Sequence, residues 1–260
     1  MMSRSGRRGI RFAIALLSAA TLLWSGIASA VPARIVLLRH GEKGGPWTLC
    51  QVGRDRAQAL VSYYVGKGAR KSVFRPGETP RAILALSLHT LETIYPVADS
   101  WDLPVVFYAV MPELVDGRFL IRDSRLNART REAVKDIMEK PEWAGQTLLV
   151  NWEHDHIART EPDPTLAASE QDRTNFHITS PEEKATLYAL LGLDQLPGVP
   201  RTWPDNTYDY IWIIDFDQKT GKPIAFSSMK EEFGPPFEQV PQNDWGKSEG
   251  LTAASGCVLP

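Results

Sequence analysis

Arginine and histidine stand side by side near the start of the chain, at the end of an apolar run. Residues 35–38 are all apolar, and Arg39, His40 and Gly41 follow them directly. A neutral imidazole can attack phosphorus, and a guanidinium offers a planar fork of donors that matches phosphate oxygens. The glycine lets the backbone turn sharply and approach a bound anion. These residues therefore indicate phosphoryl chemistry, with His40 as the nucleophile and Arg39 as a phosphate ligand.

Two later apolar runs also end in polar residues. His89 follows one of them, and Glu153 and His154 follow the other, at residues 148–152. The carboxyl ends of parallel strands meet at one edge of a sheet, where ligands bind, so we expect both histidines to lie near His40. Because successive strand residues point to opposite faces, Glu153 is expected to point away from His154.

The hexapeptide LLRHGE at residues 37–42 resembles the signature of the histidine phosphatase superfamily, which has the phosphoglycerate mutase-like fold. Segments at 48–60, 86–98 and 148–154 resemble further blocks of that family, in the same order. The resemblance implies hydrolysis of a small phosphomonoester through a phosphohistidine intermediate, without a metal or other cofactor. The expected partner is thus a small phosphorylated substrate or inorganic phosphate.

The resemblance also implies roles for individual residues. His154 would bind phosphate. In the acid phosphatase and phytase branch, a His-Asp pair supplies the second histidine and the proton donor, and Asp155 occupies the matching position. Glu42 is the competing proton donor, and Gly41, Glu42 and His89 are expected to line the substrate site.

One position departs from the family pattern. The third block normally carries an arginine four residues before a threonine, but His89 stands at that distance before Thr93. A histidine is charged only below its pKa, whereas an arginine is always charged. Either His89 replaces the arginine, or Arg81 or another arginine reaches in, or phosphate is held weakly. The first alternative function is therefore a non-catalytic protein of the same fold that binds phosphate or another anion.

The histidines also suit a metal ion. His40, His89, His154 and His156 all fall at the expected sheet edge, and imidazole is a common metal ligand. His154 and His156 flank Asp155, so both could face one ion. A metal-dependent hydrolase is the second alternative, although these residues are not part of an extended metal-binding motif and no pair of cysteine ligands accompanies them.

The first thirty residues have the features of a secretory signal peptide. Four arginines precede an apolar stretch at 12–24, and Ala-Ser-Ala at 28–30 fits a cleavage site. We therefore expect a mature domain at 31–260, periplasmic or secreted, that has no membrane association after cleavage. It holds 25 basic and 31 acidic residues, a net charge of −6, so a nucleic-acid partner is not expected.

The only two cysteines are Cys50 and Cys257. Export takes a chain into an oxidising compartment, which favours a disulfide between them over two free thiols.

Strand and helix patterns alternate along the chain. Continuous apolar runs predict strands, and apolar residues at helical spacing predict helices. Strands are expected at 34–38, 81–87, 104–108 and 146–152, helices at 53–65, 90–100, 129–139 and 180–191, and a hairpin at 208–217 and 224–229. This order predicts an α/β three-layer sandwich, in which a mainly parallel sheet has helices on both faces and antiparallel C-terminal edge strands.

Overall fold

The computed structural model describes residues 30–159 and 184–258. All of the expected signal peptide except Ala30 lies outside these residues. So do residues 160–183, which include the start of the helix expected at 180–191.

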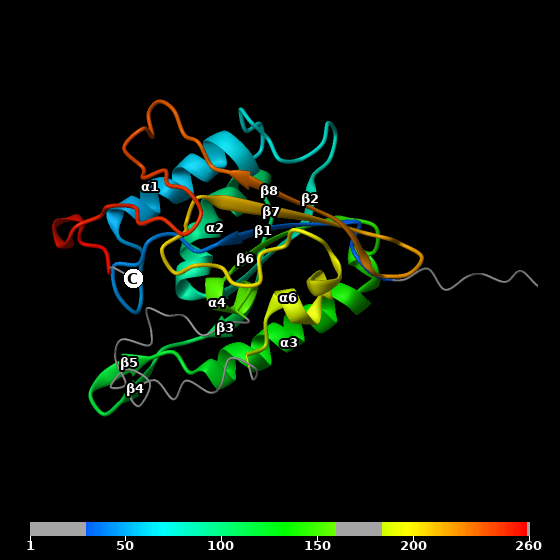
Figure 1. The fold of residues 1–260 in the computed structure, drawn as a ribbon, viewed down its shortest axis with the longest axis horizontal. Helices are drawn as coiled ribbons and strands as arrows, with labels where there is room; N and C mark the ends of the chain where they lie inside the picture. Colours follow the sequence, from blue (N-terminus) through cyan, green and yellow to red (C-terminus); the bar gives the residue numbers. More distant parts are fainter. Residues whose placement is uncertain (1–29, 160–183, 259–260) are drawn as a thin grey trace, which may run out of the picture.

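A six-stranded, mostly parallel sheet runs through the centre of the described chain (Figure 1). Its strand order is β3-β2-β6-β1-β7-β8. The strands are β1 (Arg34–Arg39), β2 (Pro80–Ser87), β3 (Val105–Val110), β6 (Thr147–Trp152), β7 (Tyr210–Phe216) and β8 (Pro223–Lys230). The first four are parallel to one another, whereas β7 is antiparallel to β1 and β8 to β7. The mixed α/β fold and its antiparallel C-terminal edge are thereby confirmed.

The α-helices are α1 (Gln51–Leu60) with a π-helical turn at Val61–Val65, α2 (Leu88–Trp101), α3 (Asp123–Glu139), α4 (His154–Ile157) and α6 (Leu187–Leu190).

Alternate residues of β1 belong to two separate buried clusters. Ile35 and Leu37 lie in a cluster that includes residues of α3 and α6. Val36 and Leu38 lie in a second cluster with residues of α1 and α2. Because β1 is buried along its whole length, it holds the residues at its carboxyl end in fixed positions.

Three elements differ from the expectation. Helix α3 begins at Asp123 rather than 129, because buried Leu126 and Thr130 extend its inward face toward Ala133. A short hairpin, β4 (Glu113–Val115) and β5 (Arg118–Leu120), lies where only a loop was expected. In the described part of the expected 180–191 helix, only α6 is helical, and the Thr186 side chain caps it.

The disulfide between Cys50 and Cys257 is present, with a Cα–Cα distance of 5.1 Å, which confirms the expected pairing. Among the helices of the described residues, none is long and apolar enough to cross a bilayer.

Candidate active site

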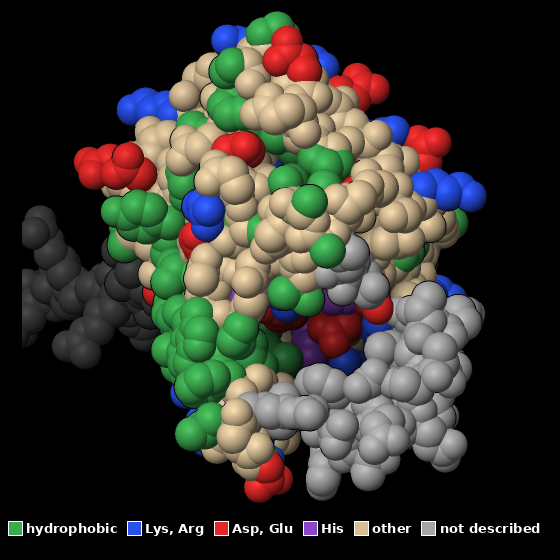
Figure 2. Space-filling model, turned by 90° about the vertical axis from the view of Figure 1, so that its left-hand side faces the viewer, with side chains coloured by type: hydrophobic (Ala, Val, Ile, Leu, Met, Phe, Trp, Pro, Cys, Tyr) green, Lys and Arg blue, Asp and Glu red, His purple; other side chains and the backbone are tan. Residues whose placement is uncertain are grey.

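The carboxyl ends of β1, β2 and β6 bring three histidines together. His40 follows β1, His89 lies in the first turn of α2, and His154 opens α4. The ring centroid of His40 lies 6.0 Å from that of His89 and 5.7 Å from that of His154. Figure 2 shows a hollow on this side of the molecule in which histidine, acidic and basic side chains are visible.

The His40 ring is held in one orientation. Its Nδ1 lies 2.7 Å from the carbonyl oxygen of Gly41, which can only accept, so Nδ1 carries the hydrogen. Its Nε2 lies 3.3 Å from Nη2 of Arg39 and 3.2 Å from Oε2 of Glu153. Burial and the charge of Lys43 keep the pKa of His40 well below its ordinary value. A neutral ring therefore presents the Nε2 lone pair to the site.

Arg39 is fixed from behind by the segment that precedes β7. Its Nη1 donates to the backbone carbonyls of Pro204, Asp205 and Thr207, at 3.2, 2.7 and 3.1 Å. Its guanidinium carbon lies 3.8 Å from the centroid of the Tyr208 ring, in cation–π contact. This support leaves Nη2 directed at His40.

His154 is supported on one side and open on the other. Its Nε2 lies 2.6 Å from Oδ1 of Asp205, which also accepts from Arg159 at 2.8 Å. Its Nδ1 is buried and has no hydrogen-bond partner among the described residues. Burial and the charge of Arg39 lower the pKa of His154 to about 4. A bound anion would favour the protonated ring, because the Nδ1 hydrogen could then be donated to it.

Glu153 lies at the centre of the cluster, contrary to the expectation that it points away. Strand β6 ends at Trp152, so Glu153 is the N-cap position of α4 and the alternation of strand side chains does not apply. Besides His40, its carboxylate contacts Oγ of Ser87 at 2.5 Å and Nζ of Lys43 at 3.0 Å. Burial opposes ionisation, but the charge of Lys43 outweighs it and holds the pKa of Glu153 well below its ordinary value.

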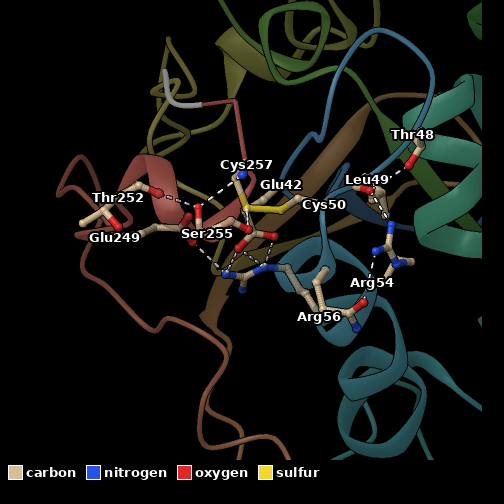
Figure 3. Close-up of a disulfide and its surroundings, with 12 residues drawn as sticks. Glu42, Thr48, Leu49, Cys50, Arg54, Arg56, Glu249, Thr252, Ser255 and Cys257 are labelled. Carbon is tan, nitrogen blue, oxygen red and sulfur yellow. Dashed lines mark hydrogen bonds and ion pairs between the residues drawn. A yellow bond between two sulfur atoms is a disulfide. The ribbon is translucent and has the colours of Figure 1, made fainter.

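Two carboxylates considered as proton donors have other partners. Asp155 is paired with Lys184 and with Nδ1 of His156. Glu42 lies 2.7 Å from Nη2 of Arg56, in the ion-pair cluster drawn in Figure 3. Burial opposes the ionisation of both carboxylates. Even so, the charge of Lys184 keeps the pKa of Asp155 below its ordinary value, and the charge of Arg56 does the same for Glu42. Each carboxylate thus serves an ion pair.

Arg81 is exposed on β2 and does not reach the position where the resemblance led us to expect an arginine. His89 lies in the cluster, with Nε2 2.7 Å from the Gly45 carbonyl and Nδ1 4.0 Å from Oε1 of Glu153. Beside Arg39, the second positively charged side chain of the site is Lys43, the residue after the LLRHGE hexapeptide.

Sequence reasoning missed Lys43, Asp205 and Tyr208 as members of the site. Lys43 could have been inferred from its position beside the signature. The segment at 204–208 carries no recognisable motif, and only the pairing of β7 with β1 brings it to Arg39.

The same groups offer a possible metal site. His40, Glu153 and His154 can each provide one ligand atom, and these atoms lie within 4.8 Å of one another. However, Nη2 of Arg39 lies 3.3 Å from Nε2 of His40, and Nζ of Lys43 lies 3.0 Å from Oε2 of Glu153. Two fixed cations at this position favour an anion over a metal ion.

A scan against known protein families finds no match, and no curated protein matches the sequence.

Proposed function

We propose that the chain is an exported phosphatase that hydrolyses a small phosphomonoester through a phosphohistidine at His40. One observation carries the proposal: the Nδ1 hydrogen of His40 is donated to the Gly41 carbonyl, so the Nε2 lone pair faces a buried hollow lined by Arg39 and Glu153. The LLRHGE signature supports it. The two buried clusters also support it. One includes residues of α1 and α2 and the other residues of α3 and α6, as expected for helices on the two faces of a three-layer sandwich.

The proposed first step transfers the phosphoryl group to His40. Nε2 attacks phosphorus while the bond to the ester oxygen breaks, and Arg39, Lys43 and a protonated His154 balance the charge on the phosphoryl oxygens. The leaving alkoxide takes a proton from Glu153. In the second step a water attacks phosphorus, the bond to Nε2 breaks, and Glu153 accepts the proton of the water.

The proton on Glu153 must arrive with the substrate. Since the pKa of Glu153 is held well below its ordinary value, the free site contains the carboxylate. A phosphomonoester monoanion carries the required proton, and it loses this proton near pH 6. We therefore expect kcat/KM to fall as the pH rises above about 6.

The decisive test replaces His40 with glutamine. His40→Gln should abolish hydrolysis and the acid-labile phosphoenzyme, because glutamine cannot form the bond to phosphorus. The matched control is His156→Gln: His156 is buried and contacts Asp155 and Asn127 rather than the hollow, so this variant should keep its activity. Near-native turnover by a folded His40→Gln protein would exclude this mechanism.

A metal-dependent hydrolase remains the second candidate, because the His40–Glu153–His154 group favours it. Activity that is lost with a chelator and restored by a divalent metal would establish it. Tight phosphate binding without turnover of any phosphoester would instead identify an anion-binding protein.

Export is part of the proposal. The Cys50–Cys257 disulfide is typical of an oxidising compartment, and the N-terminal signal pattern would direct the chain there. The release of residues 1–30 would be seen as a new N-terminus at Val31 in protein recovered from the periplasm or medium.

A further inference from the structure

A pocket of about 510 Å³ lies between α1 and α2. Trp47, from the loop after β1, and Leu88, Leu91 and Tyr95 of α2 form its apolar wall. Trp47 is 39% exposed and Tyr95 61%. The Trp47 ring also packs edge-to-face on Phe119 of β5, with centroids 4.9 Å apart, which extends the apolar surface to the hairpin. Its size and lining are typical of a pocket for a small organic ligand.

The pocket and the candidate active site share the elements that form them. Gly45, two residues before Trp47, accepts the hydrogen bond of His89. Leu88 directly precedes His89 on α2. In Figure 2, hydrophobic side chains gather at the edge of the hollow that contains the histidines. A ligand with its phosphoryl group at His40 could therefore extend over Trp47.

The charged side chains of the pocket have partners within the protein. Arg54 donates to the Leu49 carbonyl at 2.6 Å and to the Gln51 side chain at 3.0 Å. The Glu92 carboxylate accepts from the Leu49 backbone at 2.7 Å. The pocket therefore offers mainly apolar contact, which suits a ring better than a polyhydroxy group.

We infer that this pocket binds an aromatic or similarly apolar group on the leaving alcohol of the substrate, an inference that rests on the proposed function. The phosphoryl group would occupy the hollow beside His40, and the ring would pack on Trp47. Contacts with such a remote part of the substrate raise kcat/KM when they persist in the transition state. The substrates would then be aryl or arylalkyl phosphates rather than phosphates of sugars or glycerol.

Two measurements on the mature protein test the inference. The first compares kcat/KM for 2-naphthyl phosphate and for glycerol 3-phosphate. The second measures, by calorimetry, the binding of naphthylmethyl phosphonate and of methylphosphonate, which are not hydrolysed. The variants are Trp47→Ala and, as a matched control, Ile224→Ala, which removes an exposed apolar side chain from β8.

We expect the naphthyl compounds to be preferred in both measurements. Trp47→Ala should reduce that preference about tenfold, which corresponds to about 1.4 kcal/mol of binding free energy. Ile224→Ala should keep the preference. Equal binding of the two phosphonates by the wild type, or an equal effect of Trp47→Ala on both, would overturn the inference. If naphthylmethyl phosphonate binds more tightly but no ester is hydrolysed, the proposed function fails while the apolar subsite stands.

Discussion

Among single residues, Glu153 has the most contacts with the other groups of the site. Its buried carboxylate touches Ser87, Lys43 and His40, and one oxygen lies 4.0 Å from Nδ1 of His89. Lys43 stabilises its charge, so a proton held there is readily given up. In the proposed mechanism Glu153 is the donor to the alkoxide leaving group, and its carboxylate is then the base for the attacking water.

Replacement of Glu153 tests whether Glu153 or Asp155 is the proton donor. Glu153→Gln should lower kcat for an alkyl phosphate by about 10²–10⁴, the usual range for a general acid. It should affect 4-nitrophenyl phosphate much less, because that phenolate leaves without a proton. Steady-state kinetics with both substrates measures the difference.

Asp155→Asn is the matched variant. It should lower the melting temperature, because Lys184 loses one of its charged partners and keeps Asp123. It should leave the difference in kcat between the two substrates unchanged. A selective loss of alkyl phosphate hydrolysis in Asp155→Asn would return the role of donor to Asp155.

The residues of the site were predictable only where a strand delivers them. Apolar runs locate Arg39, His40 and His154 at strand ends, and the structure places these three together. The position of Glu153 was predicted wrongly, because the alternation of strand side chains was extended one residue beyond the end of β6, to the N-cap position of α4. The contribution of Asp205 depends on a pairing between segments far apart in the chain.

At the scale of elements, the loop that carries His40 packs directly against the start of α1. The backbone of Gly41 faces that of Gly53, and a Cβ on Gly53 would lie 2.3 Å from the Glu42 carbonyl oxygen. The Cys50 backbone N–H donates to the same oxygen at 2.9 Å. This close approach of loop and helix requires glycine at position 53.

Gly53→Ala should therefore disturb both stability and activity. The added methyl meets backbone atoms that cannot rotate away, so we expect a loss of about 1–3 kcal/mol in unfolding free energy, as for overpacking. Because the loop must shift, kcat/KM should fall as well. Urea denaturation and turnover are the measurements, with Gln58→Ala, an exposed position on the same helix, as the control. If Gly53→Ala changes neither the unfolding free energy nor turnover, the loop and the helix can move apart without cost.

The elements themselves were predictable in proportion to their burial. The expected strands β1, β2 and β6 agree with the structure to within one residue at each end, because parallel strands covered on both faces are continuously apolar. The hairpin of β4 and β5 was missed, since strands of three residues are too short to show a period.

At the scale of the whole molecule, one buried arginine joins segments from four parts of the chain. Arg56 of α1 contacts carboxylates of Glu42, Asp209, Glu231 and Glu249 (Figure 3 shows the first and last). One positive charge faces four acids, so some of them hold protons. Burial, together with the charge of Asp209, raises the pKa of Glu231 to about 8 despite Arg56. Burial and Glu42 also raise the pKa of Glu249.

This cluster predicts a decline in stability on the alkaline side. Between its unfolded pKa of 4.5 and its folded pKa of about 8, Glu231 binds a proton only in the folded state, so stability falls as the pH rises. The lowered pKa values of His40 and His154 act in the opposite direction, but only up to about pH 6.5, the unfolded value. Unfolding free energy should therefore decrease from pH 6.5 to 8, by up to about 1.4 kcal/mol per pH unit from Glu231 alone.

Denaturant titrations of Glu231→Gln across this range check the prediction. The variant should be flatter with pH than the wild type, because glutamine resembles the protonated acid and does not titrate. Glu232→Gln changes an exposed neighbour and should keep the wild-type slope. A wild type whose stability does not change between pH 6.5 and 8 would mean that the cluster holds no excess proton.

The strand order has a consequence for how the chain is made. Strand β1 is among the first described segments to leave the ribosome, but it pairs with β6 and β7, which are made much later. The disulfide that joins its loop to the tail spans a separation of 207 residues and cannot close before residue 257 has emerged. During synthesis the apolar residues 35–38 thus lack their neighbours and are open to aggregation or to a chaperone. The segment that leads to His40 is made early and is shielded last.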